Sequence, residues 1–182
     1  MTILNELHQD HINLNKMLAI LRLKVEKLRA GNHPNFSLMA DVVDYISNYA
    51  DAYHHPREDS MYAHFKGRSD ELDAMINSCE KAHHDMRTTC HELADTIDGI
   101  LHDAVIPMDE FTDKLEAFLD EQSEHLKLEE GSVFPLLQGV ASDEDWQQLI
   151  AELPKSDDPL FGEKQAAQYS DLYKELIVDM NE

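Results

Sequence analysis

The chain has 182 residues and a formal net charge of −22, from 37 acidic and 15 basic side chains. This length favours one domain that can bury a sizeable core. The negative charge argues against a nucleic-acid partner, because phosphates would be repelled. The sequence has no run of about 18 apolar residues that would predict a membrane span. Its start lacks a basic segment followed by an apolar one, so we expect no secretory signal.

Glycine and proline gather in four segments that predict breaks between helices. These segments are 31–35, 66–71, 102–110 and 138–145. Short connections between long helical stretches predict an all-α fold, an antiparallel up-down-up-down four-helix bundle over residues 1–140. Residues 141–182 are expected to form additional C-terminal helices that pack on the bundle through Trp146, Leu160 and Phe161.

Apolar residues recur three or four positions apart in all four stretches, as on the buried face of a bundle helix. One histidine interrupts this apolar seam in each stretch, and two of the histidines are followed by a glutamate four residues later. The six residues are His11, His54, Glu58, His83, His125 and Glu129. Positions i and i+4 are neighbours on one helix face, so each pair can offer an imidazole and a carboxylate to one point.

The seam spacing also distinguishes between neighbouring histidines at two places in the sequence. His54 shares the apolar seam of its stretch, whereas His55 falls with Asp51 on a face that we expect to meet solvent. By the same test His83 lies on the seam and His84 lies off it. The spacing therefore predicts one inward histidine in each pair.

In an antiparallel bundle the four seam histidines would lie roughly 15 to 20 Å from one end, at the helical rise of about 1.5 Å per residue. They and the two glutamates then form a single layer. Burying two carboxylates without positive partners costs several kcal/mol each, and no lysine or arginine shares the seam at that level. The layer therefore predicts a metal site.

The donor set narrows the choice of metal. Four imidazoles and two carboxylates exceed what one tetrahedral zinc needs. Mixed nitrogen and oxygen donors without thiolate favour two iron ions, with manganese or zinc next. A ferritin-like site is a weaker alternative, because Glu80 and His83 supply one Glu-x-x-His half but position 122 is Gln122.

The segments DHINLNKML, HHPREDSMY and HLKLEEGSVFPLL, with one histidine in the third stretch, closely resemble the hemerythrin-like HHE cation-binding family over roughly residues 4–138. The resemblance implies a non-haem diiron centre, with or without an oxo or hydroxo bridge. In it His11, His54, His83 and His125 are terminal ligands, and Glu58 and Glu129 bridge the ions. Oxygen-storing members have a fifth histidine where this chain has Arg87. The four-histidine set is more similar to members linked to nitric oxide, oxidative stress or repair of iron centres.

We therefore expect a diiron protein that binds O₂ or NO as a carrier, scavenger or sensor. The alternatives are a diiron oxidoreductase in oxidative or nitrosative stress or in iron-centre repair, and an iron-storage or regulatory metal-binding protein. The seam offers no separate nucleophile, so catalysis would rest on the metal. Cys79 and Cys90 are too far apart on one helix to form a disulfide, which favours a cytoplasmic location.

Three features beside the seam carry smaller expectations. Pro56 lacks an N–H and predicts a kink, because the carbonyl of Ala52 loses its helical partner. Tyr53 and Tyr62 flank the motif of the second stretch and are expected to pack, with a hydrogen bond to the site as the alternative. The remaining off-seam histidines are expected at the surface. They include His8, His64, His91 and His102.

Overall fold

The computed structural model describes residues 3–153, 158–162 and 169–179, and over these residues the regular structure is helical. The first half comprises α1 (Ile3–Arg29), α2 (Phe36–Tyr45), the π-helix η1 (Ile46–His54) and α3 (His55–Phe65). The second half comprises α4 (Asp70–Leu101), α5 (Met108–Leu128), the π-helix η2 (Glu129–Val133) and α6 (Phe134–Val140). They are followed by α7 (Asp143–Glu152) and α8 (Ser170–Asp179). None of the described helices combines the length and apolar character that a membrane crossing requires.

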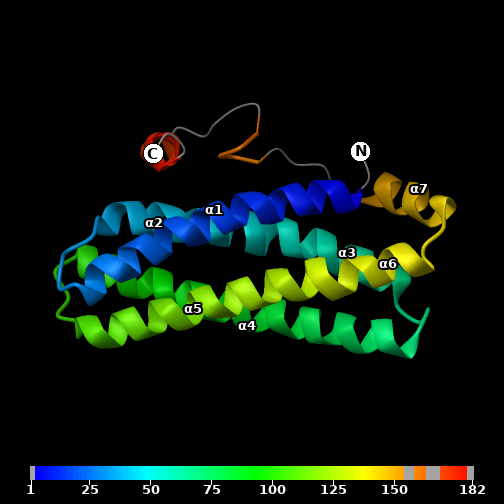
Figure 1. Ribbon diagram of the computed structural model, residues 1–182, viewed down its shortest axis with the longest axis horizontal. Helices are drawn as coiled ribbons and strands as arrows, with labels where there is room; N and C mark the ends of the chain where they lie inside the picture. Colours follow the sequence, from blue (N-terminus) through cyan, green and yellow to red (C-terminus); the bar gives the residue numbers. More distant parts are fainter. Residues whose placement is uncertain (1–2, 154–157, 163–168, 180–182) are drawn as a thin grey trace.

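The long helical segments lie side by side in an elongated bundle (Figure 1). The loops between them fall at the four predicted breaks. α1 contacts α5, α2 contacts α4, and α4 contacts α5. Ser69 caps α4 by accepting a hydrogen bond from the backbone N–H of Leu72, and Asn35 caps α2 by accepting one from the backbone N–H of Leu38. The predicted all-α bundle is confirmed.

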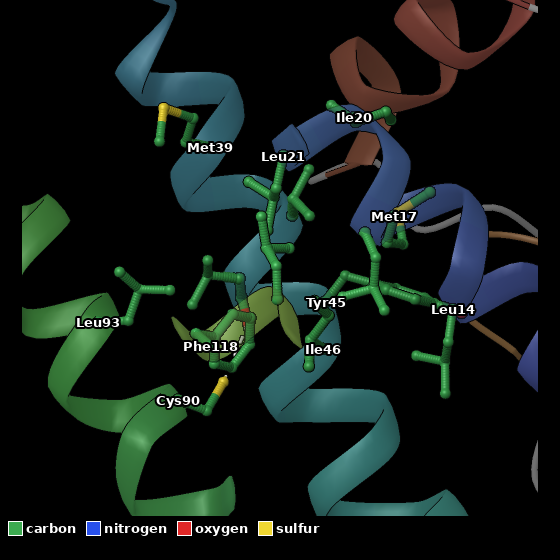
Figure 2. Close-up of a cluster of buried hydrophobic side chains, with 14 of the residues drawn as sticks. Leu14, Met17, Ile20, Leu21, Met39, Tyr45, Ile46, Cys90, Leu93 and Phe118 are labelled. Atoms are coloured by element: carbon green, nitrogen blue, oxygen red, sulfur yellow. Dashed lines mark hydrogen bonds between the residues drawn. The ribbon is translucent and has the colours of Figure 1, made fainter. Parts of the chain in front are cut away.

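Two apolar clusters fill the interior, one on each side of a polar layer. Figure 2 shows part of the first cluster, where Leu21, Ile46 and Phe118 come from three different elements. The second cluster includes Leu7 and Ile76. In each long segment the seam histidine falls between residues of one cluster and residues of the other. The apolar packing therefore closes the polar layer from both directions.

Described residues after α6 contact the bundle through aromatic and apolar side chains. Trp146 of α7 lies against Phe65, with ring centroids 4.9 Å apart. Phe161 meets the edge of Tyr45 at 6.1 Å, and Leu160 is fully buried in the first cluster. α8 also contacts α2. These contacts cover faces of the bundle on the α1–α2 side and at α3.

Each paired His/Glu motif coincides with a π-helical segment followed by a proline. η1 ends at His54 and η2 begins at Glu129. Pro56 and Pro135 then occupy the first turns of α3 and α6, which continue directly from η1 and η2. The N–H of His55 bonds to the carbonyl of Ala50, five residues back. The helical turn before Pro56 is thus wider than an α-helical turn, and the kink at Pro56 stays a prediction.

The first cluster supplies a test of the packing. Leu21 is fully buried, while Leu23 on the same helix is 44% exposed. We expect Leu21→Ala to lower the free energy of unfolding by about 2–5 kcal/mol, because it leaves a cavity in a closely packed core. Leu23→Ala is the matched control and should change it by less than about 0.5 kcal/mol. Denaturant unfolding at equal metal content measures both, and equal losses would contradict this placement of the core.

Candidate metal centre

The six side chains predicted to form one layer converge in the bundle interior. Each is at most 5% exposed. They come from every long segment: His11 from α1, His54 from η1, Glu58 from α3, His83 from α4, His125 from α5 and Glu129 from η2. Helix formation places the two members of each His/Glu pair one turn apart on one face, and packing of the bundle brings these faces together.

Glu58 lies at the middle of the layer. Its Oε1 atom is 3.2 Å from Nε2 of His11 and 3.3 Å from Nε2 of His54. Its Oε2 atom is 3.4 Å from Nε2 of His83. This one carboxylate therefore faces imidazoles from three different helical segments.

Glu129 faces the same interior from the opposite side of the bundle. Its Oε2 atom is 3.3 Å from Nε2 of His125 and 3.4 Å from Nε2 of His11. Its Oε1 atom is 3.5 Å from Nε2 of His83 and accepts a hydrogen bond of 2.5 Å from the phenol of Tyr62. Tyr62 thus reaches the site as a donor, the role that the sequence left as an alternative to packing.

An outer set of acids holds three of the four imidazoles by their second nitrogen, Nδ1. The pairs are His11 with Glu130 at 2.7 Å, His54 with Asp10 at 3.0 Å and His83 with Asp59 at 2.7 Å. Such carboxylates fix the orientation and tautomer of a ligating histidine. Each acid adjoins a site residue in the sequence. Nδ1 of His125 is buried without a hydrogen-bond partner.

The charges of the layer compensate one another. Burial raises the pKa of Glu58, but the His54 imidazole, a hydrogen bond with His11 and the close contacts with His54 and His83 hold it well below its usual range. Burial lowers the pKa of His11, but the close contact with Glu129 and the hydrogen bonds to Glu130 and Glu58 outweigh it and raise this pKa well above the ordinary value. Without a metal, protonated imidazoles therefore supply the positive charge that the carboxylates need.

The residues fit metal cations. Buried Nε2 of His54, Oε2 of Glu58 and Oε2 of Glu129 have no hydrogen-bond partner, although buried polar atoms rarely lack one. Two groups of potential metal ligands share Glu58, and within each group the ligand atoms lie within 4.8 Å of one another. One group is His11, His54 and Glu58, and the other is His55, Glu58, His83 and His125. Nitrogen and oxygen donors in this ratio suit iron, manganese or zinc.

The solvent-facing position predicted for His55 is wrong. The side chain is 1% exposed, its ring stacks on His83 with centroids 4.2 Å apart, and Nδ1 lies 3.1 Å from Oδ1 of buried Asp51. The π-helix explains the error, because η1 has more residues per turn than the α-helical spacing assumes. Burial lowers the pKa of His55 to about 4. Arg87 is exposed and donates a hydrogen bond to the backbone carbonyl of Asp51.

Three other residues that the sequence analysis named are placed by the structure. His84 is exposed, as predicted. Glu80 pairs with Lys66 at 3.1 Å, away from the layer, which weakens the ferritin-like alternative. Cys79, one turn before His83, is buried and free, and it forms a third donor group with His125 and Glu129. The sequence signal for Cys79 was its place on the apolar seam.

Residues 2–137 match the family model of the hemerythrin HHE cation-binding domain. The chain belongs to this family. A search of curated proteins finds no match. The match spans α1 to α5 and most of α6, which carry the whole His/Glu layer. Membership in the hemerythrin HHE family, together with the buried His/Glu groups, makes this a metal-binding helical protein.

The raised histidine pKa values make the stability of the metal-free hemerythrin domain depend on pH. The pKa of His83 rises to about 12 because the hydrogen bond to Asp59 and the close contacts with Glu129 and Glu58 outweigh its burial. Its stabilising effect is full below about pH 6.5, the unfolded value, and is lost as the pH rises toward the folded pKa. We expect the metal-free protein to unfold at a lower temperature at about pH 9 than at about pH 6.5.

Thermal unfolding followed by circular dichroism measures this difference. The depressed pKa of Glu58 acts with the opposite sign, so its contribution is lost as the pH falls below about 4.5. An unfolding temperature that does not change between about pH 6.5 and about pH 9 would contradict protonation of the histidines in the metal-free layer.

Proposed function

We propose that this chain binds two iron ions in the His/Glu layer and that the iron pair binds a diatomic gas, O₂ or NO, as a carrier, scavenger or sensor. The observation that carries the proposal is Glu58, a fully buried carboxylate shared by two donor groups. His11 and His54 would hold one ion, and His83 and His125 the other. Glu58 and Glu129 would bridge them. When bound, the iron pair supplies one-electron chemistry and open coordination positions for a small ligand.

The side chains around the layer favour a small, uncharged ligand over a larger polar one. The two apolar clusters close the layer along the bundle axis, and Phe134 stacks on the His11 ring with centroids 5.4 Å apart. A diatomic gas can pass between such side chains without losing hydrogen bonds, whereas burial of a larger polar substrate would leave polar groups without partners. The phenol of Tyr62 adds a hydrogen-bond donor beside Glu129.

Metal counting tests the ligand assignment. We expect two irons per chain after anaerobic purification and reconstitution with Fe²⁺, and the loss of at least one in Glu58→Gln, because a bridging carboxylate contacts both ions. Glu80→Gln is the matched control, since Glu80 pairs with Lys66 outside the layer. Elemental analysis after dialysis measures the stoichiometry. A single zinc in the wild type would instead favour the regulatory metal-binding alternative.

Optical spectra test the gas proposal separately. We expect the ferrous protein to develop charge-transfer bands on exposure to O₂ or NO, and the Glu58→Gln variant to lack them. Two irons per chain without new bands would reject gas binding and favour iron storage. Consumption of many equivalents of gas or peroxide with an added reductant would identify the oxidoreductase alternative.

A further inference from the structure

The three outer acids, Asp10, Asp59 and Glu130, each bind a site histidine on a neighbouring helical segment, and together these pairs form an incomplete ring around the bundle. Asp10 of α1 reaches His54 at the end of η1, and Asp59 of α3 reaches His83 of α4. Glu130 of η2 reaches back to His11 of α1. In each pair the acid holds a histidine on another helical segment. A fourth acid, on α4 and reaching His125 of α5, would complete the ring.

The position that this fourth acid would take is Ala82. Helices α1 and α4 run in the same direction (Figure 1), and each supplies one site histidine. Asp10 immediately precedes His11, and Ala82 immediately precedes His83. An alanine side chain has no hydrogen-bond acceptor. Nδ1 of His125 is accordingly buried without a partner, unlike the Nδ1 atoms of the other three predicted ligands.

A groove lies at the same gap in the ring. It has a volume of about 650 Å³, runs between α4 and α5, and is lined by both Ala82 and His125. Leu93 and Phe118 give it apolar walls. Its acidic lining residues are Glu92, Asp120, Glu121 and Glu124, against the single cation Lys114. The groove therefore joins an acidic surface to a site histidine.

We propose that divalent metal ions enter and leave the centre through this groove, and that His125 is the ligand that moves to let them pass. The inference rests on the proposed metal centre. Acidic groups raise the local concentration of cations at the groove. A histidine without an outer carboxylate is less firmly oriented than one that has it. By contrast, Asp10 holds His54 and is itself held by the phenol of Tyr49 at 3.0 Å.

Supplying the missing outer carboxylate next to His125 tests the role of this histidine. Ala82→Asp places a carboxylate at the position that Asp10 occupies relative to His11. Because loss of an outer carboxylate commonly changes metal affinity by about 10–100-fold, we expect Fe²⁺ release to an excess of chelator to slow by about 10-fold. Ala74→Asp is the control, since Ala74 is exposed on the same helix and the substitution adds the same charge. Stopped-flow absorbance with anaerobic Fe²⁺ measures both rates.

Removing charge from the groove tests the route without changing the layer. In Glu121→Gln/Glu124→Gln we expect Fe²⁺ uptake at low salt to slow on the order of 3- to 10-fold, with the final stoichiometry unchanged. The control is Asp109→Asn/Glu110→Gln, which removes two exposed charges at the start of α5. Should Ala82→Asp fail to fold by circular dichroism, this pair decides the question alone.

The outcomes separate the two proposals. A wild type that takes up no metal rejects the centre itself. A wild type that binds two irons, with uptake and release unchanged in the groove variants, rejects the route and leaves the centre intact. Slower uptake in both pairs of charge variants would show a general effect of net charge, and it would also reject the route.

Discussion

The structure depends on two carboxylates, Glu58 and Glu129, buried completely in the interior of a helical bundle. Their charge is too costly to bury alone, so positive charge has to reach them from all sides. Each of the four long segments supplies one imidazole for this purpose. Protons on His11, His54 and His83, whose pKa values are raised, satisfy the carboxylates in the absence of metal, which makes metal binding an exchange of protons for cations. Folding and metal binding are therefore coupled through the same few atoms.

The layer keeps its geometry because charge alternates outward from the centre. Inner carboxylates face the Nε2 atoms, and outer carboxylates hold three of the Nδ1 atoms. The apolar clusters on either side supply the burial energy that lets so many ionisable groups stay inside. Most of the apolar packing and the donor atoms thus occupy different levels of one bundle. A substitution such as Leu21→Ala acts on the first and leaves the donor atoms in place.

Much of this arrangement could be predicted from the sequence, because seam spacing places His11, His83 and His125 on faces with regular α-helical periodicity. His54 was also identified, although it ends a π-helix. His55 was not, because the wide turn of η1 carries it and Asp51 inward and no local spacing rule anticipates that. The outer acids adjoin site residues in the sequence, but their partners lie on other helices. Those pairings depend on how the helices are aligned, which periodicity does not report.

The two halves of the centre differ, and the difference follows from single residues. Around His54 the chain packs Asp10 and Tyr49, whereas the buried His55 faces His83 and His125. Around His125 it places Ala82 and an open groove, and the second nitrogen has no partner. A tightly held imidazole fixes its ion, whereas a loosely held one lets its ion exchange. Under the proposed route, metal ions would exchange on the His125 side of the layer, and the asymmetry traces to Ala82, where the corresponding position of α1 is Asp10.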